Sequence, residues 1–238
     1  MSPQPQFTLY GAGSSAVMKV VLMLEELHLS YRFEHVKIFR GEQFSPAFQA
    51  LNPNGRVPVL VDHGTNRTVF ESGAILIYLA EEFGEFLPDK GEERYEVLQW
   101  LMLEVSGIGP TFGQHLHFTR FEPNVSDYAR ERYTSQAIRL MDVVEQRLQE
   151  RKYLCDEQYS IADMAAFAWL GRLEVFKLPH EGRKNIVRWC KDIAARPATE
   201  RMEQLARQIR DEATANRSQA GEDDMDRLFG RGEFLRRS

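Results

Sequence analysis

The chain has 238 residues, and 43% of them are hydrophobic, which is ordinary for a globular protein with a buried core. It carries 35 acidic and 30 basic side chains, and the resulting net charge of −5 is not gathered into a long block of one sign. These values exclude a disordered chain and argue against a nucleic-acid partner.

Membrane insertion and metal binding are both disfavoured. The longest apolar run near the start, "AVMKVVLMLEEL", contains Lys19, Glu25 and Glu26. It is too short and too charged to cross a bilayer or to serve as a signal peptide, so we expect a soluble, cytoplasmic protein without membrane contact. Cys155 and Cys190 are the only cysteines, and they form no C-x-x-C pair. We therefore expect neither a disulfide framework nor a metal site.

The chain opens with the pattern of a βαβ unit. Residues 6–11 are typical of a short strand, and "SSAVMKVVLMLEELHL" then places apolar residues at helical spacing. The following "YRFEHVKI" alternates as a strand does. The two strands should lie parallel and be joined by a right-handed crossover.

The pattern then changes to an antiparallel hairpin. Two short apolar segments, 57–61 and 67–70, flank the turn-rich "DHGTN", which predicts a hairpin and hence a mixed four-stranded sheet. The helix "SGAILIYLAEEF" follows, with Ser72 as a candidate N-cap and Gly84 at the position where a glycine ends a helix.

After residue 85 only helical patterns recur. Ser160 and Asp163 fit the [ST]-x-x-[DE] capping box before one helix, and Pro197 should begin another or break the chain before it. The change in periodicity predicts an α/β domain at 1–85, an all-α domain at 93–212 and a polar, partly ordered tail at 213–238. The expected helical segments are 93–112, 127–151, 161–176, 183–196 and 198–212.

Pro58 indicates an exposed backbone edge. Proline cannot donate to a sheet ladder, so it is confined to the edge of a strand, to its first residue or to a bulge. If the Val57–Pro58 bond is cis, the N–H and C=O groups of Val57 should point outward and pair with an extended peptide, as an added strand does.

Two helix starts flank this edge. Gly11, Gly13 and Ala16 fit G-x-G-x-x-[GA], but the chain does not continue as a dinucleotide-binding half would, so an easy tight turn explains the glycines better. Ser14 and Ser15 stand where unpaired N–H groups favour an anion, although one serine can simply be the N-cap. Glu71 and Ser72 form a second such site, and a small acidic peptide would suit the groove between the two.

Four segments together resemble the glutathione transferase family: "LYGAGSSA" at 9–16, "NPNGRVPVLVD" at 52–62, "ESGAILIYLAEEF" at 71–83 and "YSIADMA" at 159–165. The resemblance covers nearly all of residues 6–205. It implies a thioredoxin-like N-terminal domain of βαβ-α-ββα order, an all-α helical-bundle C-terminal domain and a homodimer. Segments near 41–49 and 98–118 resemble most closely the bacterial nu-class and fungal prion-regulator-like branch.

The resemblance also implies roles for individual residues. Val57, before Pro58, would pair with the cysteinyl backbone of glutathione, and Glu71 and Ser72 would hold its γ-glutamyl end. Gln43 would reach its glycyl end. For Arg132, a further contact of that branch, a solvated helix charge is an equal alternative.

The sulfur site departs from the nu-class pattern, which has a threonine and an asparagine where this chain has Ser14 and Ala16. Serine classes of the family carry "GSS" here, so Ser14 is the expected partner of the sulfur and Ser15 the reserve. Tyr10 is expected in the core. His115 and His117 could line the cleft for the second substrate, but a packed structural role is the expectation for both.

Two functions remain open. One is a transferase that directs the glutathione thiolate at a hydrophobic electrophile, with peroxide or disulfide reduction as a side activity. The other is a non-catalytic glutathione-binding or regulatory protein, which the missing polar group at Ala16 favours.

Overall fold

The residues fall into two compact units, each of which makes most of its contacts internally, and the β-sheet belongs to the first unit. The computed structural model describes residues 5–235. Residues 1–75 and 201–238 form one compact unit, and residues 76–200 form the other. The domain ranges expected from the sequence, 1–85, 93–212 and 213–238, stay a prediction, and the two units are described in turn.

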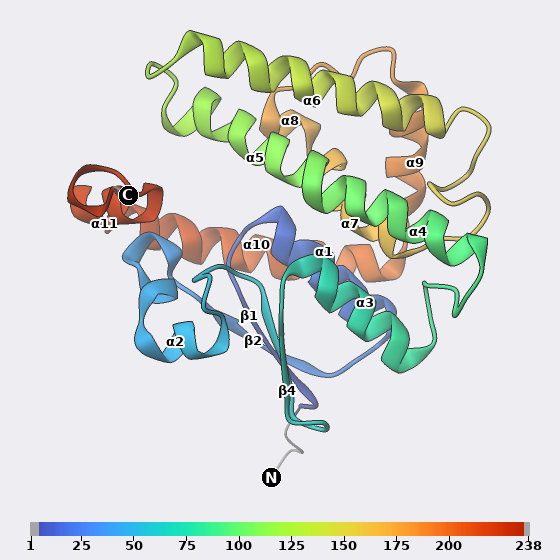
Figure 1. The fold of residues 1–238 in the computed structure, drawn as a ribbon, viewed down its shortest axis with the longest axis horizontal. Coiled ribbons are helices and arrows are strands. Elements are labelled where there is room, and N and C mark those ends of the chain that lie inside the picture. The colour runs from blue at the N-terminus through green and yellow to red at the C-terminus, as the bar shows by residue number, and fades with distance from the viewer. Residues whose placement is uncertain (1–4, 236–238) are drawn as a thin grey trace. The chain divides into compact units, whose positions relative to one another are not determined.

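The four strands have the predicted mixed arrangement. Their order across the sheet is β2-β1-β3-β4, with β1 parallel to β2 and antiparallel to β3, and β3 antiparallel to β4 (Figure 1). The strand bounds are Phe7–Gly11 (β1), Tyr31–His35 (β2), Val59–Asp62 (β3) and Arg67–Phe70 (β4). The predicted βαβ unit and hairpin are thus confirmed, and β3 begins one residue after Pro58 because proline has no N–H for the ladder.

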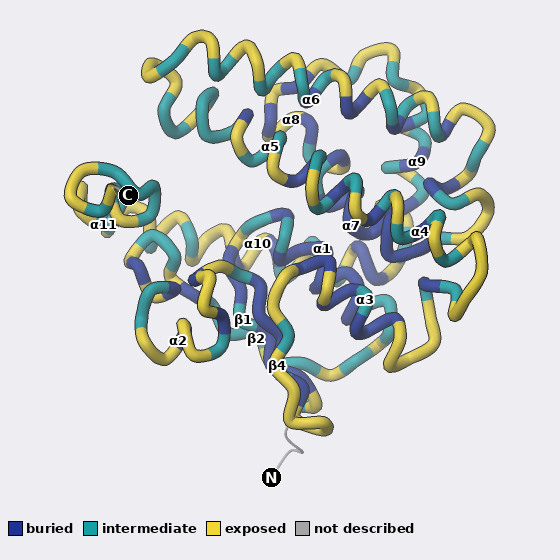
Figure 2. The backbone as a smooth tube through the Cα atoms, viewed as in Figure 1, coloured by how far each residue is buried: buried dark blue, intermediate teal, exposed yellow. Residues whose placement is uncertain are grey.

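Helix α1 (Ser15–Glu26) provides much of the core of this unit. Val17, Val20, Val21 and Leu24 are fully buried, and Figure 2 shows β1 and α1 as mostly buried segments. Between β2 and β3 the chain forms the short helical turns Ile38–Arg40 (η1) and Glu42–Phe44 (η2) and the helix α2 (Pro46–Leu51).

Helix α3 (Ser72–Phe83) begins at the residue predicted to be its N-cap, one position earlier than expected. Ser72 is its first helical residue, and the carbonyl of Glu71 accepts the hydrogen bond from the Ile75 N–H. The prediction that Ser72 is the N-cap is therefore wrong by one residue. The predicted stop at Gly84 is confirmed, since this glycine has φ 69° and its N–H bonds to the Ala80 carbonyl.

In the second unit, every regular element that the structure describes is a helix, as predicted. Residues 92–121 run continuously, because α4 and α5 are joined and followed by single turns of π-helix (η3, η4). The bounds are Glu92–Leu103 (α4), Glu104–Ile108 (η3), Gly109–Leu116 (α5), His117–Phe121 (η4), Asp127–Arg147 (α6), Ile161–Leu170 (α7), Leu173–Phe176 (α8) and Lys184–Ala194 (α9).

The predicted capping box at the start of α7 is confirmed. The Ser160 hydroxyl accepts from the Ala162 N–H at 3.3 Å, and Asp163 Oδ2 accepts from the Ser160 N–H at 3.1 Å. Asp163 is fully buried, and its Oδ1 also accepts from the Leu154 N–H and from Trp189 Nε1, each at 2.9 Å. One carboxylate thus joins α7, α9 and the preceding loop.

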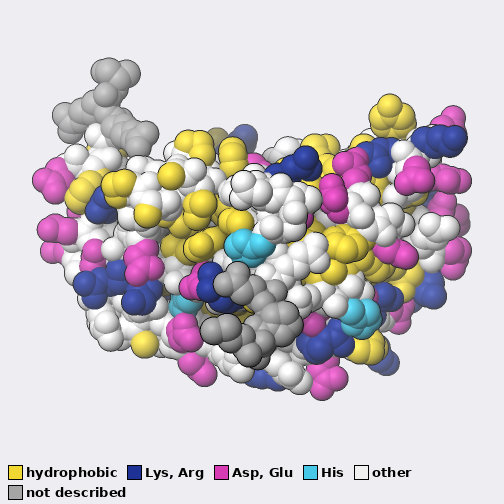
Figure 3. All heavy atoms as spheres, turned by 90° about the horizontal axis from the view of Figure 1, so that it is seen from below, with side chains coloured by type: hydrophobic (Ala, Val, Ile, Leu, Met, Phe, Trp, Pro, Cys, Tyr) yellow, Lys and Arg dark blue, Asp and Glu magenta, His cyan; other side chains and the backbone are white. Residues whose placement is uncertain are grey.

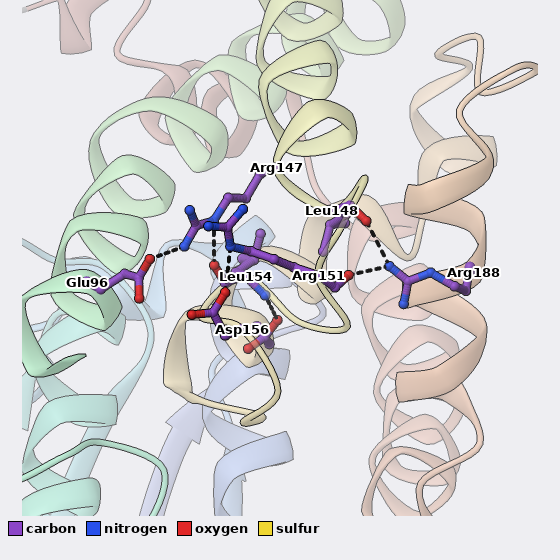
Figure 4. A network of polar contacts seen from close by, with 8 residues as sticks. Glu96, Arg147, Leu148, Arg151, Leu154, Asp156 and Arg188 are labelled. Atoms are coloured by element: carbon purple, nitrogen blue, oxygen red, sulfur yellow. Dashed lines mark hydrogen bonds and ion pairs between the residues drawn. The ribbon is translucent and has the colours of Figure 1, made fainter.

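Arginine side chains hold the loop between α6 and α7 (Figure 4). Arg147 pairs with Glu96 and donates to the Leu154 carbonyl, while Arg151 pairs with Asp156 at 2.6 Å. Arg188 donates to the carbonyls of Leu148 and Arg151. The Leu148 carbonyl belongs to the C-cap of α6, and those of Arg151 and Leu154 belong to the loop, so these bonds join the helix end and the loop to α6 and α9.

The C-terminal part of the chain is more regular than predicted. Helix α10 (Pro197–Ser218) starts at Pro197, as expected, and runs six residues past the predicted end at 212. It is followed by α11 (Glu222–Phe229) and a 3₁₀ turn, Gly232–Phe234 (η5). Residues 201–218 of α10, α11 and η5 belong to the unit that contains the sheet.

Candidate functional site

The strand order brings the predicted site residues of the first unit to one edge of the sheet. In the ladder, Tyr10 lies opposite Val59, Val59 opposite Phe70, and Gly11 opposite His35. The ends of β1, β2 and β4 and the start of β3 therefore share one edge. Ser14, Val57 and the pair Glu71–Ser72 follow or precede these strand ends by at most three residues, so the topology places them together.

Ser14 is the N-cap of α1. Its backbone is extended, and its hydroxyl accepts from the Val17 N–H at 3.4 Å. A serine hydroxyl has lone pairs and one O–H, so it can accept this bond and still donate to an anion in front of the helix. The structural role and the predicted catalytic role of Ser14 are therefore compatible.

Ser15 is the first residue of α1 and is 7% exposed. Its hydroxyl makes no hydrogen bond with any residue in the described part of the chain. Because it stands inside the helix, Ser15 is less suited than Ser14 to face a ligand at the helix mouth. This difference favours Ser14 as the partner of a bound anion.

Val57 offers the free backbone edge that Pro58 suggested. The Val57–Pro58 peptide bond is cis. Val57 lies outside the β3 ladder, and within residues 5–235 its N–H and C=O groups have no hydrogen-bond partner. An extended peptide could therefore pair with this residue.

The turn before Val57 is built by a buried asparagine. Asn52 is 1% exposed, donates through Nδ2 to the Arg56 carbonyl at 2.7 Å and accepts from the Asn54 N–H at 3.0 Å. Gly55 has φ 61°, and a Cβ atom on it would lie 3.1 Å from the Gln43 carbonyl oxygen. The "NPNG" turn thus fixes Val57 relative to residues 43–44.

Glu71 adopts a backbone conformation that is rare for its residue type. Its φ of 71° lies in the left-handed region, which costs a non-glycine residue about 1 kcal/mol or more. Glu71 is exposed, and the adjacent Ser72 begins α3. The strain turns the chain sharply from β4 into α3, whose first N–H groups then stand at the edge of the sheet.

Gln43 lies at the same edge but is enclosed. It is 3% exposed, its Nε2 donates to the Ile38 carbonyl at 3.1 Å, and its Oε1 is buried without a hydrogen-bond partner. An unpaired buried oxygen costs free energy, so it marks a place where a bound donor would be favourable. Sequence reasoning identified the residue but not its burial.

Arg132 stands in the second unit, exposed on α6. Its expected role stays a prediction. His115 is buried and bonds to Thr134 Oγ1 and to the Phe176 carbonyl, which confirms its structural role. Tyr10 packs edge-on against Phe48 in the core, as predicted.

Metal chemistry has no visible basis in residues 5–235. No three His, Cys, Asp or Glu side chains of this range lie close enough together to hold an ion. Among the helices of the same range, none has the length and hydrophobicity of a membrane span. Acidic and basic side chains are interspersed on the face drawn in Figure 3, in keeping with the modest net charge.

A mixed four-stranded thioredoxin-like sheet combined with an all-helical part is the architecture of glutathione transferases, and the chain belongs to the glutathione S-transferase family. The model of the family's N-terminal domain matches residues 5–81, and that of its C-terminal domain matches residues 116–197. The family resemblance seen in the sequence is thereby confirmed.

Relatives of the chain include bacterial and fungal proteins. The chain is 40% identical to the disulfide-bond oxidoreductase YfcG of Escherichia coli (strain K12), over 80% of this chain and 91% of that protein. It is 39% identical to glutathione S-transferase 2 of Schizosaccharomyces pombe (strain 972 / ATCC 24843), over 84% and 96% of the two chains. Among solved structures, the glutathione transferase URE2P8 from Phanerochaete chrysosporium with oxidized glutathione superposes with a TM-score of 0.83 at 31% identity, covering 89% of this chain and 99% of that one.

Proposed function

We propose that this protein binds glutathione along Val57 and activates its thiol for attack on an electrophilic small molecule. The observation that carries the proposal is the pair of unpartnered Val57 backbone groups at the sheet edge where Ser14 caps α1. In this arrangement the cysteinyl residue of glutathione pairs with Val57 next to Pro58, and its sulfur faces Ser14. Several of the superposable structures, including URE2P8, were solved with glutathione or its oxidized form.

The other proposed contacts with glutathione run in the order of its residues, from the γ-glutamyl end to the glycyl end. Glu71 and Ser72 hold the γ-glutamyl group, with the carboxylate of Glu71 facing its ammonium and the start of α3 facing its carboxylate. Gln43 belongs to the glycyl end. Arg132 is a further proposed contact with glutathione.

Thiolate formation is the step that the helix terminus assists. A free thiol has a pKa of about 8.5, and lowering it by two units corresponds to about 2.7 kcal/mol. A hydrogen bond donated to a charged group contributes about 1.5–3 kcal/mol, and the N-terminal dipole of α1 adds to it. Ser14 donates this bond and does not attack.

The activated sulfur then forms the new bond. With an organic electrophile, the thiolate makes a carbon–sulfur bond and the leaving group departs with its electron pair. With a disulfide substrate, the thiolate forms a mixed disulfide, and a second glutathione releases the product as a thiol and leaves oxidized glutathione. The proposal also includes a hydrophobic electrophile as second substrate and a homodimer. It includes a cytoplasmic location as well, because the two cysteines of the described chain are unpaired and thiols stay reduced in the cytosol.

The proposal is tested by titrating bound glutathione. We expect glutathione to bind, and the ultraviolet absorbance of its thiolate in the complex to show a pKa about two units below 8.5. Bound glutathione with an unshifted thiol pKa would refute activation. That outcome would support the second candidate, a non-catalytic glutathione-binding protein, which the absence of a side-chain donor at Ala16 favours. No binding at all would refute both.

A further inference from the structure

Helix α11 lies against the turn that carries Gln43. It contacts the η1 turn, Ile38–Arg40, and Figure 1 shows it beside the segment that leads from β2 into α2. Both belong to the same compact unit, although residues 41–221 separate them in the chain. Helix α11 lies beyond residues 116–197, which the C-terminal family model matches.

Most basic side chains around this turn are already paired. Arg40 lies 3.3 Å from Asp224 Oδ2 and donates to the Gln219 carbonyl, also at 3.3 Å. Lys37 lies 3.7 Å from Glu42. These contacts hold α11 in place and leave little of the positive charge of Arg40 and Lys37 for a ligand.

Arg227 is different. Its guanidinium lies over the Phe44 ring, 5.3 Å from the centroid, and the side chain comes within 3.6 Å of the point where a Cβ atom on Gly41 would stand. It pairs with no carboxylate among residues 5–235, and the residue is exposed. An arginine stacked on an aromatic face keeps the N–H groups at its edge available for an anion.

The backbone that carries Arg227 is well defined at both ends. Asp224 accepts from the Gly221 N–H at 3.1 Å at the start of α11, and Gly230 ends the helix with φ 66°. Beyond it, Arg231 pairs with Asp226 at 2.8 Å. The guanidinium of Arg227 is therefore presented from a capped helix rather than from a loose tail.

Phe44 connects Arg227 to the backbone edge at Val57. A Cβ atom on Gly55 would lie 3.3 Å from the Phe44 ring and 3.1 Å from the Gln43 carbonyl oxygen. A tripeptide that starts at Glu71 and passes Val57 would end near these residues. Its last group is a carboxylate, and the amide nitrogen of Gln43 is already bonded to the Ile38 carbonyl.

We propose that Arg227 binds the glycyl carboxylate of glutathione. The inference rests on the proposed function, because it assigns one end of the same ligand. A bidentate pair between a guanidinium and a carboxylate supplies the charge that Gln43 lacks. The C-terminal segment is thereby part of the glutathione site, and it contributes to affinity rather than to the sulfur chemistry.

The test measures binding by calorimetry with two probes, glutathione and its ethyl ester at the glycyl carboxylate. Arg227→Gln should weaken glutathione binding about tenfold, which corresponds to about 1.4 kcal/mol. Wild type should bind the ester about tenfold more weakly than glutathione, and Arg227→Gln should not weaken ester binding further. Arg207→Gln, which removes an equal charge from an exposed position on α10, should leave both affinities unchanged.

Three outcomes would refute either the role of Arg227 or the proposed function. Equal weakening of both probes by Arg227→Gln, or no weakening of either, would refute the role of Arg227 while leaving the proposed function intact. Failure of the wild-type protein to bind glutathione would instead refute the proposed function. A thermal melt of Arg227→Gln that matches wild type would show that altered affinity does not come from unfolding of α11.

Discussion

At the scale of single residues, Ser14 and Ser15 are the pair that decides the chemistry. The sequence predicts that one of two adjacent serines at a helix start contacts the sulfur, but it does not show which one is the cap. The structure separates them: Ser14 precedes the helix with its hydroxyl at the terminus, and Ser15 is buried in the first turn. A one-residue shift in the helix start would have exchanged these environments, so only the coordinates distinguish them.

Ser14→Ala should therefore reduce glutathione-dependent turnover on the order of ten- to a hundredfold, because the thiolate loses its hydroxyl donor. It should also lower the stability by about 1 kcal/mol, because α1 loses its cap. Steady-state kinetics and urea unfolding measure the two effects. Ser15→Ala is the matched control, with a small effect on turnover, and Ser14→Thr should retain most of the activity. Equal, small losses for both alanine variants would remove Ser14 from its role.

At the scale of elements, the sequence predicts helix boundaries best where a side chain ends or starts the helix. Ser160 with Asp163, Pro197 and Gly84 each occupy the predicted boundary, because caps and prolines act through their immediate neighbours. Other boundaries are missed: Ser72, the expected N-cap, is the first helical residue of α3, and Gly171, which follows α7, is not recognised as a helix end. The helix expected over 161–176 breaks after Leu170, and α10 continues to Ser218.

Asp163 makes one of these boundaries sensitive to pH. Burial raises the pKa of its carboxyl from 3.8 to about 6, although N–H groups of Leu154, Trp189 and Ser160 bond to it and lower the pKa in part. The native state thus holds this proton more tightly than the unfolded state between pH 4 and 6. The stability from this group is greatest at low pH and falls as the pH rises through about 6, by at most about 3 kcal/mol.

We therefore expect the stability of wild type relative to Asp163→Asn to decrease as the pH rises from 4 to 7, since the asparagine cannot ionise. Urea unfolding of both proteins at each pH measures the difference. The exposed Asp89 provides the control, because Asp89→Asn should show no comparable slope. A difference that stays constant, or one that grows with pH, would contradict a raised native-state pKa for Asp163.

At the scale of the whole molecule, the mixed sheet and the helical second part follow from periodicity, and the family motifs point to the edge of the sheet where we propose that glutathione binds. The grouping of residues 201–238 with the sheet follows neither from periodicity nor from the motifs. The tail reads as polar because charged side chains dominate it, and the contacts of α11 with the η1 and η2 turns include the Arg40–Asp224 ion pair and the stacking of Arg227 on Phe44. Contacts of this kind leave no periodic pattern, so Arg227 carried no signal in the sequence.

The choice between transferase and disulfide reductase is the remaining question at this scale, and Ala16 bears on it directly. Position 16 is half-buried in the first turn of α1, two residues after Ser14, and has no side-chain donor. A mixed disulfide and its attacking thiolate place two sulfur atoms near this turn, so a second donor should stabilise the departing thiolate. With Ser14 alone, we expect stronger activity with carbon electrophiles than with small disulfides.

Ala16→Asn should then raise glutathione-dependent reduction of a small disulfide on the order of tenfold, while leaving aryl halide conjugation within about twofold, since one added hydrogen bond to a charged group is worth about 1.5–3 kcal/mol. Ala16→Leu fills a similar volume without a donor and should raise neither activity. The two variants and wild type are compared by kcat/KM on an aryl halide, a hydroperoxide and a disulfide. Equal responses to Asn and Leu would show that space, and not hydrogen bonding, governs the sulfur site.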